Sequence, residues 1–275
     1  MSKQDKHCTA VDFKSYQERL ANNRSREAPL SKQPHQLDAP TQLDSSSNSK
    51  KRKTSPRSEH TRKVVVAIRE YTKGDVAKMR RLYGILDHDN VLTAREFFVN
   101  EGRMYALVND LQHTLEQLVG CRSLYPTEAE LASMVWQILD GVCYLNETGL
   151  EHQSLTRRNI LLGLDGVIKV ASLEMCVERP PEQAQNVYIR TLASITMEIM
   201  QKYVKDDGMV GVDDVDRWPV DSDAVGFLSA LSTTKSIESL KEQPLVRKES
   251  RLVGELMLLA RSVLVSARMF YSYER

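Results

Sequence analysis

The sequence has few features of a secreted, membrane-spanning or strongly charged protein. Its four cysteines have neither disulfide-type nor metal-type spacing, so we expect reduced thiols in an intracellular protein. The N-terminus has no apolar signal-peptide core, and no apolar run reaches the roughly 20 residues that a membrane span needs. The formal net charge of +1 argues against binding by bulk charge. We therefore expect neither a nucleic-acid nor a membrane partner.

The first part of the chain has little apolar sequence. Residues 1–62 are polar and cannot bury enough apolar surface to offset their ordering entropy, so we predict a disordered tail with one short helix at 11–20. Its basic cluster consists of Lys50, Lys51, Arg52 and Lys53. This cluster is either a nuclear localisation signal or a solvated charge run, so cytoplasm and nucleus both stay open as locations.

From residue 64 the hydrophobic pattern is that of a folded domain in which strands come first and helices follow. An apolar stripe over 126–146 predicts the clearest helix. The pattern also predicts strands at 64–68, 90–98 and 104–108, a helix at 75–86, and a hairpin formed by 160–162 and 167–170. Beyond residue 186 the chain is predicted to be helical, with loops around 206–222. This order indicates a two-lobed α+β domain.

Five short motifs in this part follow the order and spacing of a protein kinase domain. Val66-Ala67-Ile68-Arg69 is similar to V-A-I-K, and 87–91 is similar to the turn after the first helix of that fold. His152 to Asn159 has the spacing of the catalytic-loop motif H-R-D-L-x-x-x-N. Segments 104–111 and 167–172 lie where the hinge strand and the strand before D-F-G belong. On these motifs, residues 64–265 resemble the protein kinase family.

Within that family the chain resembles the PAK-type serine/threonine kinases of the sterile-twenty group. Segments 159–170 and 176–183 are similar to the strands after their catalytic loop and to the start of their activation segment, and 236–246 and 252–264 to their last two helices. The resemblance implies a two-lobed kinase-like α+β fold. Its parts would be a tail over 1–62, an N-lobe over 63–111, and a mostly helical C-lobe with a C-terminal helix over 112–275.

Two parts of the kinase fold are missing from the sequence. Residues 41–63 contain no glycine, so we expect a reduced N-lobe without the glycine-rich hairpin that cradles phosphates. After Ser172 the chain soon reaches 187–200, which resembles the central helix of the C-lobe. We therefore expect a C-lobe that lacks much of the activation segment.

The resemblance also implies that most catalytic positions hold other residues. Ser154 replaces the catalytic aspartate, and a serine cannot act as a base near pH 7. Gln153 replaces the preceding arginine, and Ser172 the metal-binding aspartate of D-F-G. Arg69 replaces the lysine that pairs with ATP phosphates, which is not a conservative exchange, and Met79 replaces its glutamate partner.

A few positions remain as candidates for residual nucleotide binding. They are Arg69, Asn109, Leu111, Asn159 and Leu161. Asn159 is the sole surviving metal ligand of the family and a poor site alone, because Mg²⁺ prefers carboxylate and phosphate oxygens. Glu174, two positions after Ser172, is a weak substitute for the lost aspartate. We therefore expect neither a metal nor a cofactor.

Two further positions concern the framework of the site. His152 corresponds to a structural core residue of the family, and Tyr188 to the aspartate that braces the catalytic loop.

These replacements favour a pseudokinase that is not an enzyme and acts as a scaffold or an allosteric regulator. Loss of the general base alone typically costs about 10²–10⁴ in rate. The expected partners are proteins, an active kinase among them. Two alternatives stay open: a serine/threonine kinase relative with residual ATP binding, and a decayed or incompletely predicted paralogue without a defined activity.

Overall fold

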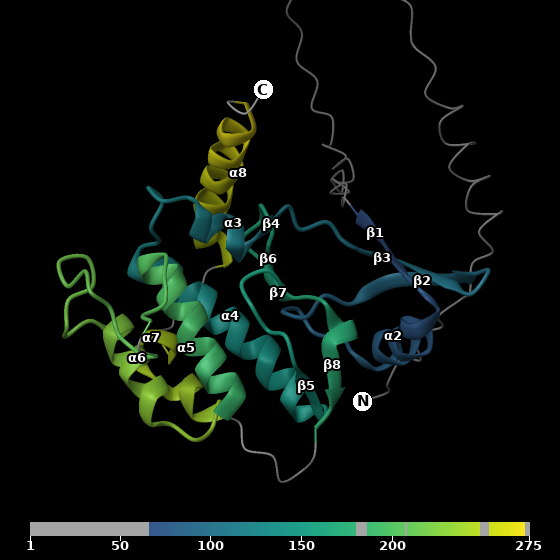
Figure 1. Cartoon of the computed structure of the whole chain (residues 1–275), viewed down its shortest axis with the longest axis horizontal. Coiled ribbons are helices and arrows are strands. Elements are labelled where there is room, and N and C mark those ends of the chain that lie inside the picture. Colours follow the sequence, from purple (N-terminus) through teal and green to yellow (C-terminus); the bar gives the residue numbers. More distant parts are fainter. Residues whose placement is uncertain (1–65, 180–185, 207, 248–252, 273–275) are drawn as a thin grey trace, which may run out of the picture. The chain divides into compact units, whose positions relative to one another are not determined.

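The computed structural model describes residues 66–179, 186–206, 208–247 and 253–272 (Figure 1). The predicted tail over 1–62, its short helix and its basic cluster lie outside these described residues. Within them, no helix has the length and apolar character needed to cross a membrane.

A three-stranded antiparallel sheet forms the first part of the described chain. Its strands are β1 (Val66–Tyr71), β2 (Ala94–Asn100) and β3 (Arg103–Asn109), in the order β1-β3-β2. Glu101 and Gly102 form the turn between β2 and β3 with φ values of 48° and 75°, a conformation that favours glycine. The helix α2 (Lys73–Ile85) follows β1 directly.

The helix α2 is attached to the sheet through its buried face. Met79 is 0% exposed and Leu82 3% exposed. The hydroxyl groups of Tyr71 and Tyr83 hydrogen-bond to each other at 2.6 Å, and the two rings meet edge to face. Met79 is thus a core residue, at the position that the kinase resemblance assigns to a glutamate.

The remainder of the described chain is mostly helical (Figure 1). Its elements are β4 (His113–Thr114), α3 (Leu115–Gly120), α4 (Glu128–Glu147), β5 (Leu150–His152), β6 (Ile160–Leu162), β7 (Ile168–Val170), η1 (Leu173–Met175), β8 (Cys176–Glu178), α5 (Asn186–Gln201), α6 (Asp223–Thr233), η2 (Glu238–Glu242), α7 (Pro244–Arg247), η3 (Val253–Glu255) and α8 (Leu256–Ser272). The short strands form two further sheets, β4-β6-β7 and β5-β8.

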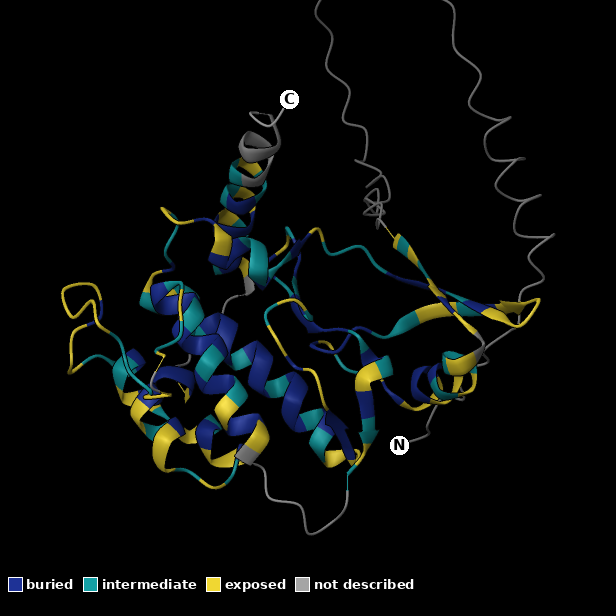
Figure 2. Ribbon diagram, viewed as in Figure 1, coloured by how far each residue is buried: buried dark blue, intermediate teal, exposed yellow. Residues whose placement is uncertain are grey.

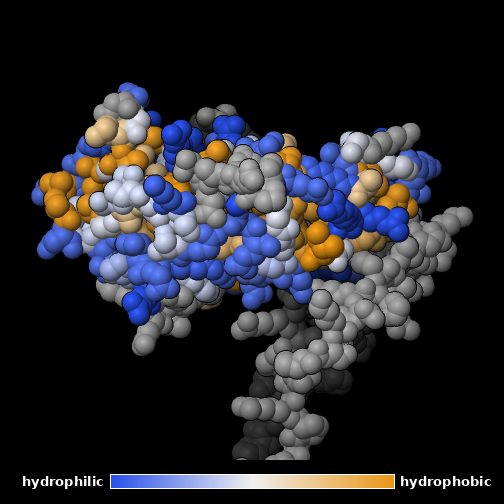
Figure 3. Space-filling view, turned by 90° about the horizontal axis from the view of Figure 1, so that it is seen from below, coloured by the Kyte–Doolittle hydropathy of each residue, from blue (hydrophilic) through white to orange (hydrophobic). Residues whose placement is uncertain are grey.

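The long helix α4 lies at the centre of this helical part. Thr127 caps it: the backbone N–H of Glu130 donates to the Thr127 hydroxyl at 3.2 Å, and the Glu130 carboxylate accepts from the Thr127 N–H at 2.7 Å. This reciprocal arrangement satisfies two N–H groups at the start of the helix. Most of α4 is buried, as Figure 2 shows. On the face drawn in Figure 3, hydrophobic side chains reach the surface in small groups among hydrophilic ones, as on most folded domains.

A buried polar junction joins the β2 side of the fold to α4 and β7. The side-chain amide of Asn90 donates to Gln137 Oε1 at 3.1 Å and to the carbonyl oxygen of Ile168 at 2.8 Å. The Val170 N–H donates to the Asn90 carbonyl at 2.8 Å, so the backbone of Asn90 also takes part. Gly141 lies against this junction, because a Cβ atom there would be 2.5 Å from the Asn90 carbonyl oxygen.

The predicted α+β content is confirmed, as are the helices at 75–86, 126–146 and 187–200 and the hairpin at 160–170 within one or two residues. The strand predicted at 90–98 is wrong in its first half, where Asn90 is engaged with α4 and β7; the strand covers Ala94–Asn100. The single helix predicted at 236–246 is also wrong. It is divided into η2 and α7, because Pro244 has no N–H with which to continue a preceding helix.

The close approach at Gly141 yields a stability prediction. Gly141→Ala should lower the free energy of unfolding by about 1–3 kcal/mol, because the added methyl group overlaps a buried carbonyl oxygen. Gly226→Ala in α6 is the matched control: nothing lies within 4 Å of the new Cβ atom, and alanine should raise stability by about 0.5–1 kcal/mol. Urea unfolding measures both, and similar effects of the two changes would contradict the close approach.

Candidate functional site

The catalytic-loop segment 152–159 runs from β5 to β6 and is held by His152. This side chain is 2% exposed, and its Nε2 lies 2.8 Å from the carbonyl oxygen of Ala171. A carbonyl only accepts, so Nε2 carries a proton, and Nδ1 accepts from the Ser154 N–H at 3.3 Å. Burial lowers the pKa of His152, which keeps the ring neutral. This geometry agrees with the structural role inferred for His152.

Tyr188 of α5 braces the start of the same loop through two hydrogen bonds to the backbone of β5. Its hydroxyl accepts from the His152 N–H at 2.5 Å and donates to the carbonyl of Leu150 at 3.4 Å. Tyr188 is 3% exposed, and burial raises its pKa, so the hydroxyl stays protonated. A neutral phenol therefore occupies the position that the kinase resemblance assigns to an aspartate, and it contacts the loop it is expected to brace.

Asn159 connects the catalytic loop to the end of β7. Its side-chain Nδ2 donates to the Ser154 carbonyl at 2.5 Å, and its Oδ1 accepts from the Ser172 hydroxyl at 3.1 Å. The Asn159 carbonyl accepts from the Ala171 N–H at 2.8 Å. Ser172 itself is in the left-handed region, with φ 59° and ψ 47°. Asn159 thus links the two segments to which the kinase resemblance assigns the catalytic and the metal-binding aspartate.

The positions of the replaced catalytic residues differ in accessibility. Ser154 and Gln153 are exposed on the loop, and Met79 is fully buried. Arg69 lines a hollow of about 380 Å³ together with Glu174 and residues 70–72 and 75. The backbone carbonyl of Glu174 accepts from Lys78 Nζ, which directs this part of η1 toward α2. Arg69 and Glu174 thus line the same hollow, and Glu174 also contacts α2 through its backbone carbonyl.

The remaining nucleotide-site candidates lie on two neighbouring segments. Asn109 ends β3, and its Oδ1 accepts from Arg95 Nε at 2.7 Å. Leu111 and Leu161 are partly buried and pack against the core. Leu161 pairs with Thr114 of β4, so the stretch after Asn109 runs beside β6. The structure brings Leu111 and Leu161 into one region, while Arg69 lies on β1, opposite Ala106.

The donor atoms around Asn159 do not suit a magnesium ion held by the protein alone. The oxygens that contact the Asn159 side chain, the Ser172 hydroxyl and the Ser154 carbonyl, are neutral, whereas Mg²⁺ is normally held through carboxylates and substrate phosphates. Across the described ranges there is no group of three or more His, Cys, Asp and Glu side chains that could bind a metal.

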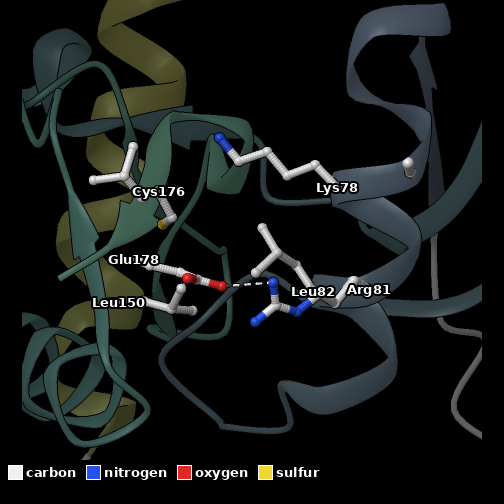
Figure 4. Close-up of a pocket in the computed structure, with 8 residues that line it drawn as sticks. Lys78, Arg81, Leu82, Leu150, Cys176 and Glu178 are labelled. Atoms are coloured by element: carbon white, nitrogen blue, oxygen red, sulfur yellow. Dashed lines mark ion pairs between the residues drawn. The ribbon is translucent and has the colours of Figure 1, made fainter.

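A second hollow, of about 470 Å³, lies between α2 and the strands β5 and β8 (Figure 4). Arg81 Nη1 and Glu178 Oε1 form an ion pair across it at 2.6 Å, drawn as a dashed line. Burial raises the pKa of the Cys176 thiol to about 12, so this side chain is a poor nucleophile at neutral pH. Lys78 and Arg81 thus attach α2 to the segment after Ser172. Their i, i+3 spacing on one helix face was the available sequence signal for this role.

The Tyr188 brace can be tested by removing one oxygen atom. Tyr188→Phe should lower the free energy of unfolding by about 1–3 kcal/mol, because the buried His152 N–H loses its acceptor. Tyr203→Phe is the control, since within the described ranges this exposed hydroxyl donates to the exposed Asp213, and it should change stability by about 0.5 kcal/mol or less. Equal effects in thermal or urea unfolding would show that the brace contributes nothing.

Comparison with known families identifies the framework to which this site belongs. A family model described as protein tyrosine and serine/threonine kinase matches residues 49–201, which is more than half of the chain. The match includes the catalytic-loop segment, β7 and the whole of α5.

Individual relatives are similar over shorter stretches. The serine/threonine-protein kinase SSN3 of Candida glabrata is 31% identical over 93 residues, which are 32% of this chain and 16% of that protein. Cyclin-dependent kinase 11B of Mus musculus is 28% identical over 107 residues, 38% of this chain and 14% of that protein. The serine/threonine-protein kinase srb10 of Schizosaccharomyces pombe is 27% identical over 92 residues, 32% of this chain and 25% of that protein. The chain therefore spans a quarter or less of the length of these relatives.

Two expectations from the sequence require correction. The relatives are named SSN3, srb10 and cyclin-dependent kinase 11, so the assignment to PAK-type kinases is not supported. The expectation that the chain is not an enzyme is wrong, because the matching model and the named relatives point to an enzyme family. That expectation rested on replaced side chains such as Ser154 and Ser172 and on the missing glycine-rich loop and activation segment, whereas the family match covers the framework around His152 and Asn159. The chain belongs to the protein tyrosine and serine/threonine kinase family.

Proposed function

We propose that this chain is a serine/threonine protein kinase relative that binds ATP beside its catalytic loop. The observation that carries this proposal is the position of Asn159, whose side chain links the Ser154 carbonyl to the Ser172 hydroxyl. Kinase catalysis depends mainly on positioning and charge stabilisation, so a loop fixed in this way preserves the part that orients substrates. The names of the relatives, which are serine/threonine-protein kinases, support the same class of activity.

The candidate residues have suitable chemistry for the two ends of a nucleotide. Leu111 and Leu161 offer partly buried apolar surface for a planar base. Arg69 offers a guanidinium group, which binds phosphate oxygens in a bidentate manner. Asn109 lies between these residues in sequence and supplies polar atoms at the end of β3. In this proposal residues 63–111 form the smaller lobe of the domain and 112–275 the larger one.

Nucleotide binding should appear as a change in thermal stability. ATP at ten times its dissociation constant should stabilise the full chain by about 1.4 kcal/mol, or about 3–6 °C in Tm. Because the oxygens beside Asn159 are neutral, we expect most of this shift without added Mg²⁺. Arg69→Ala should reduce the shift, whereas Arg80→Ala, on the exposed side of α2, should leave it unchanged. Absence of any shift at millimolar ATP would refute the proposal.

Phosphotransfer should respond to a restored general base. Ser154→Asp places a carboxylate at the exposed loop position where the family has its catalytic aspartate, and it should raise transfer of radiolabelled phosphate to a serine-containing peptide by about 10²–10⁴-fold. Thr156→Asp adds the same charge two residues away on the same exposed loop and serves as the control. The same rate for both variants would mean that position 154 does not face the reacting hydroxyl.

A second candidate function is that of a protein-binding scaffold or allosteric regulator. It is favoured by β1, which is an edge strand of the described sheet and exposes Val66 and Ile68. An edge strand presents unpaired backbone groups to which an extended segment of another protein can add. The relative cyclin-dependent kinase 11B depends, according to its name, on a cyclin, which also favours a protein partner. A photo-crosslinking residue in place of the exposed Ile68 should capture a partner protein in cells. The same residue in place of the exposed Leu258 is the control and should not. Equal capture at the two positions would count against this role.

The location of the protein follows from the same proposals. We place it in the cytoplasm, the nucleus or both, with Lys50, Lys51, Arg52 and Lys53 as a nuclear signal outside the described residues. Replacing all four with alanine in a fluorescent fusion should remove nuclear signal, and unchanged distribution would refute the role of the cluster.

A further inference from the structure

A hollow with a basic lining adjoins the catalytic loop on the side of α3 and α5. It measures about 370 Å³, and its lining residues are Glu116, Val119, Gly120, Arg122, Arg157 and Lys202. We call it the basic hollow. Arg157 belongs to the catalytic-loop segment, three residues after Ser154, so the loop that carries the proposed site of phosphate transfer also lines this hollow.

The carboxylates of the basic hollow are already engaged by two arginines. Arg157 forms an ion pair with the half-buried Glu198, and Arg158 Nε lies 2.7 Å from Glu116 Oε1. Glu116 is also 3.9 Å from Arg157 Nε. These contacts neutralise the acidic side chains of the region, so they leave no carboxylate for the other two cations of the lining.

Arg122 and Lys202 are those two cations. Arg122 is exposed, and within the described part of the chain its side chain forms no ion pair or hydrogen bond. Lys202 Nζ donates to the carbonyl oxygen of Leu118 at 3.1 Å, and no carboxylate contacts it there. Burial lowers the pKa of Lys202 to about 8, so the ammonium group is charged at neutral pH and only weakly held in that state.

A third cation increases the unbalanced charge. Lys202 Nζ lies 4.8 Å and Arg217 Cζ 3.9 Å from the centre of the Tyr125 ring, so two cations share one aromatic side chain. Each contact is favourable, but the two like charges repel one another. Arg217 is partly neutralised by Asp214 at 3.2 Å, whereas Lys202 has no such partner among the described residues. An anion in the basic hollow would relieve this repulsion.

We propose that the basic hollow binds an acidic segment of a peptide whose serine or threonine lies at the catalytic loop. This inference rests on the proposed kinase function, because it assigns a substrate class to the same site. Carboxylates match the fork of Arg122 and the point charge of Lys202, and charge-assisted hydrogen bonds of this kind are among the strong ones. The net charge of the whole chain is only +1, so the cationic surface is local and suits a short acidic segment better than a nucleic acid.

The test uses the full chain and a fluorescent peptide of alternating glutamate and serine. Its counterpart with glutamine in place of glutamate has the same length and no charge. Fluorescence anisotropy at low ionic strength should show tighter binding of the glutamate peptide, and the preference should weaken at about 0.15 M salt because the cations are partly exposed. Equal affinity for the two peptides would overturn the proposal.

A matched pair of charge reversals locates the binding. Arg122→Glu should weaken binding of the glutamate peptide by about tenfold or more, because it replaces an unpaired cation of the hollow. Arg190→Glu makes the same change of charge at an exposed position of α5, about 16 Å along the helix axis from Gln201, the last residue of α5 before Lys202, and should weaken binding by about twofold or less. Equal losses in the two variants would show that the peptide responds to net charge alone, which contradicts the proposal.

The ATP-induced change in Tm separates this inference from the function it extends. Arg122→Glu should retain the full ATP shift, because Arg122 does not belong to the nucleotide-site candidates. If ATP shifts the Tm but the glutamate peptide shows no preference, the acidic-segment inference fails alone. If the peptide binds through Arg122 while ATP causes no shift, the hollow is confirmed as an acidic-segment site and the nucleotide proposal fails.

Discussion

The buried amide of Asn90 is the contact on which the other parts of the structure depend. It connects the sheet side of the fold to α4 through Gln137 and to β7 through the carbonyl of Ile168. Gln137 in turn donates to the Gly166 carbonyl and accepts from the Ile168 N–H, so the amide nitrogen of Asn90 and both polar atoms of the Gln137 side chain have partners. In a low-dielectric interior such a network is strong when complete and costly when broken, which makes the relative placement of these segments specific.

The position of the catalytic loop depends on the hydrogen-bond network of Asn90 and Gln137. β7 is fixed by the Asn90 junction. Just after β7, the Ala171 carbonyl accepts a hydrogen bond from His152 Nε2, and the Ser172 hydroxyl donates one to Asn159 Oδ1. From the other direction, Tyr188 ties the start of the loop to α5. The loop is therefore anchored at its beginning and at its end by buried or half-buried hydrogen bonds, although several side chains on its exposed surface differ from those of the family.

Much of this fold was predictable because its main signals are local. The apolar stripe of 126–146 predicts α4 without knowledge of any partner, and the H-x-x-x-x-x-x-N spacing identifies the loop from residues close in sequence. The Asn90 junction was not predictable in this way, since Asn90, Gln137 and Ile168 are far apart in sequence and polar residues give no periodic signal. The short strands β5 and β8 were missed for the same reason: each has three residues, too few for an alternating pattern, and each exists only because the other pairs with it.

In the candidate site, too, the residues identified by local sequence spacing were predictable, and the contacts between distant segments were not. Motif alignment identified Ser154, Ser172 and Asn159, because these positions are defined by spacing. Tyr188 was interpreted as the replacement of a lost aspartate, because a sequence motif does not indicate that a phenol hydroxyl from α5 can accept from the His152 N–H. The basic hollow gave no sequence signal at all. Arg122, Arg157 and Lys202 are separated by more than a helix each, and only the packing of α3 beside α5 brings them together.

The backbone of Ser172 has a consequence for how this chain can change in the future. Its φ of 59° is in the left-handed region, which serine tolerates less well than aspartate or asparagine, whose short polar side chains interact with the local backbone. The main chain at this position therefore remains better suited to the residue type that the family carries there than to the one present. Asparagine or aspartate at position 172 would therefore fit the backbone as it stands, although aspartate would lose the hydrogen bond that the Ser172 hydroxyl donates to Asn159.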